Sequence, residues 1–271
     1  MTQKTYKTFA QRIRLETLRM IARAESSHIG SCFSIADILT VLYSSILKVS
    51  PKQPRLANRD RFILSKGHAC AILYATLAEK GFFPKQWLKK YYLPAGRLAG
   101  HVVHSAPGIE LSTGSLGHGL PVAVGMALGA KRDKKKWRVF CLLSDGELDE
   151  GSNWEALLFA PHHNLDNLTV IIDYNKIQSL DETNKTLNLE PLVGKLKSFN
   201  WAVEEIDGHN FAEIENTFKK IPFKKTRPSC IIAHTIKGKG VSFMENTVLW
   251  HYKNPIREEL KKALEELQHN A

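Results

Sequence analysis

The sequence has 271 residues, of which 43% are apolar and 24% are charged, as is usual for a soluble globular protein. This length suits one large domain with a well-buried core. No apolar run approaches the ~20 residues that a membrane-spanning helix needs, and charges interrupt the first apolar cluster, so no signal peptide is predicted. We therefore expect a cytoplasmic protein with no membrane partner.

The formal net charge of +11 suggests nucleic-acid binding, but the distribution of the charge argues against it. The lysines are dispersed, and the densest basic groups, residues 131–138 and 219–227, fall at expected connections between elements. We therefore expect no nucleic-acid partner, and a milder use of the charge is a field that attracts anionic substrates. The four cysteines lack metal-ligand spacing and are expected to be buried free thiols: Cys32, Cys70, Cys141 and Cys230.

The amino-terminal half alternates helical patterns with irregular segments. Apolar residues at helical spacing predict an amphipathic helix over residues 9–23, and SSHIGS, residues 26–31, is expected to be a loop. Ser34 and Asp37 have the spacing of a capping box, so a deeply buried helix is predicted over residues 35–47. Further predictions are a strand at 62–64, a helix at 70–80 ended by Gly81, an irregular glycine-rich segment at 91–119 and a helix at 120–131.

The middle of the sequence predicts a strand–helix–strand unit. Two short apolar runs, residues 139–143 and 168–172, suit strands that are buried on both faces of a parallel sheet. Residues 153–163 suit a helix covering one face, and such crossovers are right-handed in nearly all cases. Both strands therefore end at the same edge of the sheet. The residues expected to pack this helix are Trp154, Leu157, Leu158 and Pro161.

The remaining sequence continues the alternation of strands and helices. This order predicts an α/β fold, with a doubly wound, mostly parallel sheet and helices on both faces. We see no internal repeat and no strong domain boundary, so residues 1–271 are expected to form one domain. The predicted elements are an exposed polar segment at 181–189, helices at 192–199 and 211–219, strands at 202–206 and 230–234, and a charged terminal helix at 255–268.

Polar residues follow both central strands at the point where each strand ends. Asp145 and Gly146 come after the first strand, and Asn175 comes after the second. The carboxyl ends of parallel strands share one edge, where open α/β sheets bind ligands. A carboxylate, an amide oxygen and a main-chain carbonyl from the turn at Ile177 suit Mg²⁺ that is also bound to a diphosphate. Taken alone, Asp145 could equally be a turn residue that caps the next helix.

Several short motifs occur in order along the chain and together are specific. They are SSHIGS, SKGHA, STGSLGHG, the Asp145-Gly146 and Asn175 pair, and TIKGKG with Trp250-His251. In these motifs the chain resembles the amino-terminal, diphosphate-binding part of transketolase, from about residue 12 to about residue 255. The resemblance implies the thiamine diphosphate-binding fold, with thiamin diphosphate and Mg²⁺ as cofactors and Ca²⁺ or Mn²⁺ as possible substitute metals.

The resemblance also implies roles for residues at matching positions. His28 and His101 correspond to groups that hydrogen-bond to the sugar or transfer protons. His68 and His251 correspond to contacts with the cofactor diphosphate and the donor sugar, and Glu150 to a glutamate that links paired active sites across a dimer. The implied metal ligands are Asp145, Asn175 and Ile177, and further implied cofactor contacts are Ser31, Gly114, Ser115, Leu116, Gly146 and Lys237.

Each of these residues has a simpler interpretation when it is taken alone. A lone histidine is more often structural than catalytic, and Glu150 could be a solvated carboxylate at a helix start. The sequence also departs from the family pattern near the sugar channel, because His118 replaces a common glutamine and the residues after His101 and His251 are unusual. These departures concern the substrate more than the cofactor. Histidines expected to be structural or on the surface are His104, His118, His162 and His163.

The resemblance covers only part of an active site. In transketolases, a glutamate of a pyrimidine-binding domain promotes loss of the cofactor's C2 proton, and this sequence has no match to that domain. We expect the pyrimidine-binding and carboxyl-terminal domains on a partner chain, in a heterotetramer with two copies of each chain. The implied function is transfer of a two-carbon ketol unit from a ketose, or ketose phosphate, to an aldose. The alternatives are the alpha subunit of a 2-oxo-acid dehydrogenase, another thiamin diphosphate-dependent carboligase, or a non-catalytic subunit.

Overall fold

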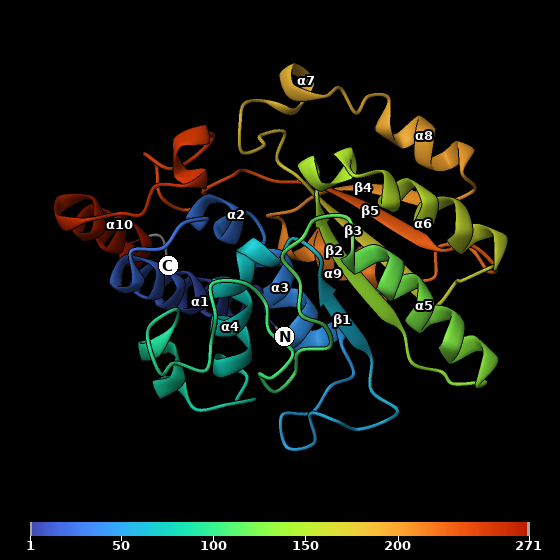
Figure 1. Cartoon of the computed structure of the whole chain (residues 1–271), viewed down its shortest axis with the longest axis horizontal. Coiled ribbons are helices and arrows are strands. Elements are labelled where there is room, and N and C mark those ends of the chain that lie inside the picture. The colour runs from blue at the N-terminus through green and yellow to red at the C-terminus, as the bar shows by residue number, and fades with distance from the viewer. Residues whose placement is uncertain (1, 270–271) are drawn as a thin grey trace.

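Five parallel strands form the centre of the computed structural model, which describes residues 2–269 (Figure 1). Every pairing between these strands is parallel. The predicted α/β fold is therefore confirmed, with a wholly parallel sheet. The strands lie in the order β1 (Arg61–Leu64), β2 (Val139–Ser144), β3 (Leu168–Tyr174), β5 (Ser229–His234) and β4 (Ala202–Asp207).

Alternate side chains of each strand pack on opposite faces of the sheet. Phe140 and Leu142 of β2 belong to one apolar core, whereas Cys141 and Leu143 belong to the other. All four are fully buried, as expected for a strand covered on both faces. The four cysteines are confirmed as free and buried.

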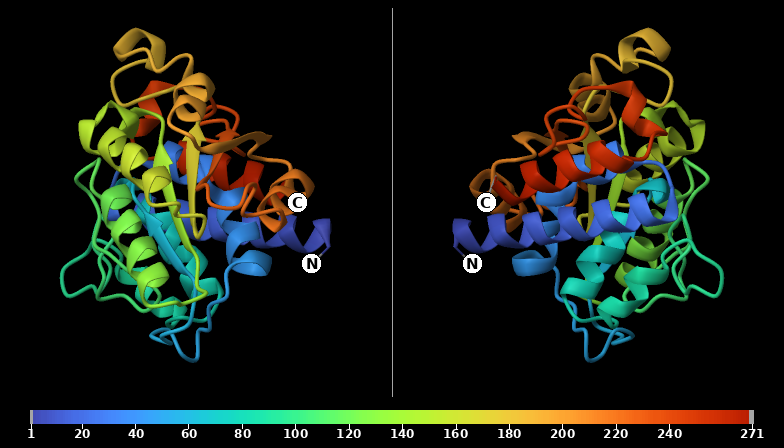
Figure 2. Two further views of the ribbon diagram at one scale, coloured as in Figure 1. Left: turned by 90° about the vertical axis from the view of Figure 1, so that its right-hand side faces the viewer. Right: turned by 90° about the vertical axis from the view of Figure 1, so that its left-hand side faces the viewer.

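Helices cover both faces of the sheet, and the direction of the chain decides which face each helix covers (Figures 1 and 2). The chain moves across the sheet from β1 to β4 and then returns to β5, and right-handed crossovers in opposite directions lie on opposite faces. One face packs α5 (Gly119–Arg132), α6 (Gly151–His162) and α8 (Leu192–Ser198); the other packs α1 (Gln3–Ala24), α3 (Ala36–Val41), α4 (Cys70–Glu79) and α9 (Phe211–Lys219), with α10 (Arg257–His269) against α1.

Two amino-terminal predictions are wrong. The segment expected to be a loop contains the helix α2 (Ile29–Ser34), which begins after His28 in the left-handed conformation, with φ 75°. Ser34 does not cap the next helix, because its buried hydroxyl donates to Asp173 Oδ2 of the sheet at 2.6 Å. The predicted helix over residues 35–47 divides into α3 and a π-helical turn, Leu42–Ile46.

Two further expectations need correction. Leu158 does not pack the sheet: it is 58% exposed, while Leu157 is fully buried. The segment over 181–189 is not wholly exposed, since it contains the short helix α7 (Thr183–Thr186) with Thr183 and Leu189 buried. Thr183 is held because its backbone N–H donates to the Lys176 carbonyl at 3.0 Å.

The long irregular segment is confirmed. Between residues 91 and 118, all of them described, the structure has only turns and the isolated bridge Val102–Thr113. The Tyr74 hydroxyl fixes this segment by donating to the His101 carbonyl at 2.7 Å and accepting the N–H of Val103 at 3.1 Å. This loop crosses the edge where the strands end.

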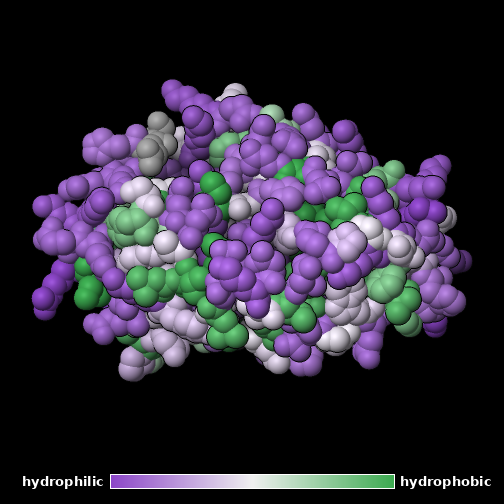
Figure 3. All heavy atoms as spheres, turned by 90° about the horizontal axis from the view of Figure 1, so that it is seen from above, coloured by the Kyte–Doolittle hydropathy of each residue, from purple (hydrophilic) through white to green (hydrophobic). Residues whose placement is uncertain are grey.

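The register of the sheet brings the ends of three strands together. Ser144 of β2 pairs with Asp173 of β3, which pairs with Ala233 of β5. Residues that follow these strands therefore emerge beside one another at the carboxyl edge. Within residues 2–269, no helix has the length and apolar character needed to cross a membrane. The face in Figure 3 is mainly hydrophilic, with separate apolar patches.

Candidate active site

A cavity of about 240 Å³ lies at the carboxyl edge of the sheet. Its walls come from α2, the loops after β1, β2, β3 and β5, the irregular loop, and the segment before α10. Residues that are widely separated in the sequence therefore line one chamber. The predicted site residues that line it are His28, Ser31, His68, His101, Gly114, Leu116, Asp145, Gly146, Asn175, Ile177, Lys237 and His251.

Two predicted site residues lie outside this lining. Ser115 is exposed, although its neighbours Gly114 and Leu116 face the cavity. Glu150 is also exposed and is the residue before α6, where it lies against Gly117. The roles assigned to Ser115 and Glu150 remain predictions.

Four histidines surround the open end of the cavity. The ring of His28 lies 5.0 Å from that of His68, 6.1 Å from that of His101 and 5.1 Å from that of His251, between centroids. Burial and the neighbouring His101 lower the pKa of His28 to about 4, and burial and Lys237 lower the pKa of His251 to about 3. Burial and the Lys66 ammonium hold the pKa of His68 well below its ordinary value. These three rings are therefore neutral at pH 7.

The candidate metal ligands lie where β2 and β3 end. Asp145 is 1% exposed; its Oδ1 accepts the Gly146 N–H at 2.7 Å and its Oδ2 accepts the Lys176 N–H at 2.6 Å. Asn175 Oδ1 accepts the Ile177 N–H at 3.1 Å. Burial and repulsion from Asp173 raise the pKa of Asp145 to about 7. A buried carboxyl in this setting is stabilised in its charged form by a nearby cation.

The donor chemistry of this edge fits Mg²⁺. The Asp145 carboxylate, the Asn175 amide oxygen and the Ile177 carbonyl all line the cavity, and each is a hard oxygen donor. Within residues 2–269, no group of three or more His, Cys, Asp or Glu side chains is arranged to hold a metal. A site here would therefore use the mixed donor set and take its other ligands from water or a bound diphosphate.

Lys237 supplies a buried positive charge beside these donors. Its Nζ donates to the Ile177 carbonyl at 2.8 Å and lies 2.9 Å from His251 Nδ1, which acts as the acceptor. Burial lowers the pKa of Lys237 to about 8, although attraction to Asp145 opposes the change. Gly30 lets α2 approach this lysine, because an added Cβ would lie 3.1 Å from Lys237 Cγ and 3.2 Å from the Trp250 carbonyl.

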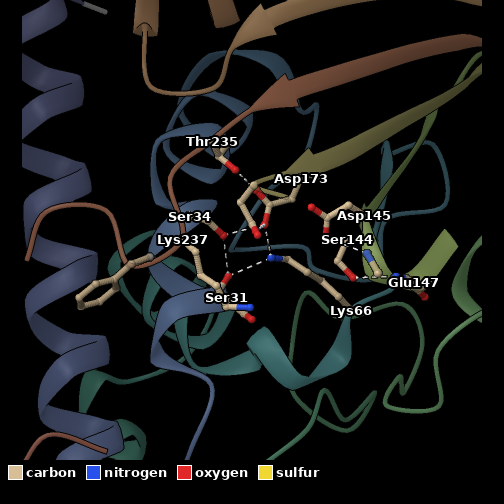
Figure 4. A network of polar contacts seen from close by, with 12 residues as sticks. Ser31, Ser34, Lys66, Ser144, Asp145, Glu147, Asp173, Thr235 and Lys237 are labelled. Carbon is tan, nitrogen blue, oxygen red and sulfur yellow. Dashed lines mark hydrogen bonds and ion pairs between the residues drawn. The ribbon is translucent and has the colours of Figure 1, made fainter. Parts of the chain in front are cut away.

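A buried ion pair forms the floor of the site (Figure 4). Lys66 Nζ lies 2.6 Å from Asp173 Oδ2, and the two side chains are 1% and 0% exposed. Lys66 also donates to the Ser31 carbonyl at 2.9 Å, and Asn175 Nδ2 donates to the Asp173 carboxylate at 3.0 Å. Burial opposes ionisation of Asp173, but Lys66 and the surrounding donors hold its pKa below the ordinary value. The pair thus joins two predicted site residues, Ser31 and Asn175.

A second buried carboxylate supports the STGSLGHG loop. Glu147 is fully buried, and its Oε1 accepts the Ser65 hydroxyl at 2.6 Å and the Gly117 N–H at 3.1 Å. Burial raises the pKa of Glu147. The contacts tie the loop after β1 to the loop after β2.

Sequence reasoning missed several residues of this site. Lys66 lies inside the SKGHA motif, and Asp173 is a charged residue in an otherwise apolar strand, so both carried a signal. Tyr252 stood out only as an unusual neighbour of His251, yet its ring lies 5.8 Å from that of His28 at the mouth. The missed lining residues are Lys66, Ser144, Gln178, Ser179 and Tyr252.

The surface prediction for the other histidines is confirmed in its main part. His104, His118 and His162 are exposed, and His163 is partly buried. None of the four lines the cavity.

Comparison with known proteins identifies the same region. The family model described as transketolase, thiamine diphosphate binding domain, matches residues 5–270. One of the two subunits of an apulose-4-phosphate transketolase from Phocaeicola vulgatus is 38% identical over 267 residues, covering 98% of this chain and 95% of that relative. A 6-deoxy-6-sulfo-D-fructose transketolase subunit from a Clostridium species is 40% identical, with 94% of each chain covered.

Longer transketolases match over a part of their length. Human transketolase is 39% identical over 248 residues, which are 91% of this chain and 39% of the human protein. The crystal structure of transketolase from Campylobacter jejuni superposes with a TM-score of 0.94 at 33% identity, covering 99% of this chain and 43% of that one. The chain thus spans nearly all of the relatives that are named as transketolase subunits and about two fifths of the longer proteins.

Proposed function

Because this chain belongs to the transketolase family through the thiamine diphosphate binding domain, we propose that it is the amino-terminal subunit of a two-component transketolase. The assembled enzyme transfers a two-carbon ketol unit from a ketose donor to an aldose acceptor. The observation that carries this proposal is the cavity at the carboxyl edge, whose walls combine oxygen donors, a buried lysine and four histidines.

The oxygen donors and the lysine are suited to the two cofactors. Asp145, Asn175 and the Ile177 carbonyl would hold Mg²⁺, while Lys237 and the backbone at Gly146 would face the diphosphate of thiamin diphosphate. An added Cβ at Gly146 would lie 2.9 Å from Gln178 Cγ, so a larger residue would narrow this part of the cavity. When bound, thiamin diphosphate supplies the nucleophilic carbon for carbon–carbon bond cleavage and formation.

The histidines are suited to proton transfer at the sugar. His28, His68 and His251 form a group of neutral rings, so each presents one acceptor and one donor nitrogen. His101 is exposed at the mouth, where a sugar would enter. Ketol transfer moves protons to and from hydroxyl and carbonyl oxygens, and histidines at hydrogen-bond distance perform such transfers.

The active site is completed by a second subunit. The chain corresponds to nearly the whole of relatives that are themselves named as transketolase subunits, and we assign the activating carboxylate to the pyrimidine-binding domain of the other subunit. Large apolar side chains beside the cavity are available to that partner: Leu180, next to the cavity residue Ser179, is 76% exposed, and Tyr252 is 62% exposed. Burying them would add favourable apolar contact.

Two copies of this chain would pair through the face formed by α5 and α6. Leu158 and Phe159 of α6 are 58% and 42% exposed, and Val122 of α5 is 36% exposed. Glu150 stands at the start of α6 on this side, as expected for a residue that connects two active sites. The complete enzyme would then be a heterotetramer.

The donor is proposed to be a ketose with an anionic end group. The two subunit relatives are named for a phosphorylated sugar and for a sulfonated sugar. The formal net charge of +11 favours the approach of such anions. The identity of the ketose depends on the partner as well, because the partner would line much of the sugar channel.

The test combines binding with reconstitution. Titration calorimetry of the mixed subunits should give Mg²⁺-dependent binding of thiamin diphosphate, and ketol transfer should require both chains. Trial donors are apulose 4-phosphate, 6-deoxy-6-sulfofructose and xylulose 5-phosphate. Failure of the mixture to bind the cofactor, or equal turnover by this chain alone, would contradict the proposal.

A matched pair of variants tests the partner surface. Leu180→Lys should weaken association with the partner, because it places a charge on the apolar surface beside the cavity. Leu56→Lys is the control: Leu56 is also exposed, at 46%, but precedes β1 and therefore lies toward the amino edge of the sheet. Equal association of the two variants in analytical ultracentrifugation would remove Leu180 from the interface.

A further inference from the structure

A chain of polar side chains reaches the cofactor site from outside the cavity. His209 lies between β4 and α9, and it does not line the cavity. Its Nε2 accepts the backbone N–H of Ile236 at 2.9 Å, and its Nδ1 lies 2.8 Å from Asp37 Oδ2. Ile236 is the residue immediately before Lys237. A side chain outside the site thus binds the backbone next to a residue inside it.

The hydrogen bonds determine the tautomer of His209. A backbone N–H can only donate, so Nε2 must carry its lone pair, and the ring proton is on Nδ1. Nδ1 then donates to Asp37. Asp37 is itself fixed by Arg14, whose two terminal nitrogens donate to its two carboxylate oxygens at 2.8 Å each. Such bidentate, charge-assisted bonds hold geometry well.

Burial adds rigidity to this chain. Arg14 is 7% exposed and Asp37 is 5% exposed, and the His209 side chain is 13% exposed. Arg14 also donates to the Phe33 carbonyl of α2 at 3.2 Å. The position of His209 is therefore set by α1, α2 and α3, which are all outside the segment that it binds.

The bound segment is a short piece of backbone beyond the end of β5. Thr235 N–H donates to the Tyr174 carbonyl at 3.3 Å, and Gly238 N–H donates to the Gly30 carbonyl at 3.0 Å. Between these points, the Ile236 N–H is fixed by His209. The Lys237 side chain extends from this segment to the Ile177 carbonyl and to His251. A shift of the backbone would move its ammonium group.

We propose that His209 is a positioning residue for the cofactor site: it fixes the backbone at Ile236 and thereby directs Lys237 into the cavity. The proposal rests on the proposed function, since it assigns Lys237 to the cofactor diphosphate. His209 touches neither the cavity nor a reacting atom, so it is not a catalytic residue. Its loss should weaken cofactor binding by freeing Lys237, without removing any group of the site.

Two amide substitutions separate the two hydrogen bonds of His209. In His209→Gln, the side-chain oxygen reaches the position of Nε2 and accepts the Ile236 N–H. In His209→Asn, the shorter amide reaches only the position of Nδ1 and donates to Asp37. The Asn variant should bind thiamin diphosphate about 5- to 100-fold more weakly, because a partly buried N–H loses its acceptor. The Gln variant should stay within about threefold of the parent.

The matched control is His234→Asn. His234 ends β5, three positions before Lys237, but its side chain is 42% exposed and contacts Glu205 on the sheet edge, at 2.9 Å. This variant should leave cofactor affinity unchanged. Equal weakening by His209→Gln and His209→Asn would overturn the proposal, because the preserved acceptor would then have no effect.

Amide hydrogen exchange of the cofactor-free chain gives an independent readout. The peptide that covers residues 235–238 should exchange faster in His209→Asn than in the parent, and His209→Gln should restore the protection. Unchanged exchange in the Asn variant would refute the positioning role. Failure of the parent protein to bind thiamin diphosphate would refute the proposed function instead, and the exchange comparison would still decide the role of His209.

Discussion

The buried pair of Lys66 and Asp173 allows a quantitative prediction. Lys66→Met keeps most of the side-chain volume but removes the ammonium group, which lies 2.6 Å from Asp173 Oδ2 where neither side chain is more than 1% exposed. Removing one partner of a buried pair costs about 3–5 kcal/mol, because the other charge is left uncompensated. Three further donors to Asp173 remain, from Ser34, Asn175 and Thr235, so we expect the low end, ~3 kcal/mol.

This loss is large enough to measure by thermal unfolding. For a domain of this size, a change of 1 kcal/mol shifts the midpoint by about 2–4 °C, so Lys66→Met should lower it by roughly 6–12 °C. Lys185→Met is the control, because its partners are half exposed and such pairs contribute little. The control should move the midpoint by about 2 °C or less.

A double-mutant cycle with Asp173→Asn tests the cause. Asp173→Asn alone should also destabilise the protein, since it leaves the Lys66 ammonium buried without its counter-charge. The double variant should be more stable than the sum of the single effects predicts, by about 2 kcal/mol. Additive effects, or a loss below about 1 kcal/mol for Lys66→Met, would refute the account of the pair as mutual charge compensation.

Three other changes address the metal site, proton transfer and acid stability. Asp145→Ala should abolish Mg²⁺-dependent cofactor binding while the fold persists, so unchanged affinity in calorimetry would contradict the metal assignment. His101→Ala should reduce turnover of the assembled enzyme by about 10²–10⁴-fold with a smaller effect on cofactor affinity; a loss below about tenfold would make His101 structural. Burial raises the pKa of Asp37, but Arg14 and the His209 hydrogen bond outweigh it and lower the pKa to about 2. Its contribution of roughly 2–3 kcal/mol should therefore be present above pH ~4 and lost as the pH falls toward 2. Acid unfolding of Asp37→Asn should lack this part of the slope, and an unchanged slope would contradict it.

The sequence alone determined the elements whose pattern is local. Short apolar runs with β-branched residues predicted β2 and β3, because strands buried on both faces require apolar side chains at successive positions. The order of strands and helices then placed Asp145 and Asn175 at one edge of a parallel sheet. The lining of the cavity by most of the predicted residues follows from that topology and from the matched motifs.

Tertiary structure decided the contacts that no local pattern encodes. Lys66 and Asp173 are 107 positions apart, and His209 and Asp37 are 172 positions apart, so only the packed sheet and helices bring them together. Ser34 shows the competition directly. Its spacing to Asp37 predicted a helix cap, but burial against β3 gave its hydroxyl a carboxylate partner instead. A buried polar group takes the partner that the folded core places nearest, because leaving it without a hydrogen bond costs more than giving up a local cap.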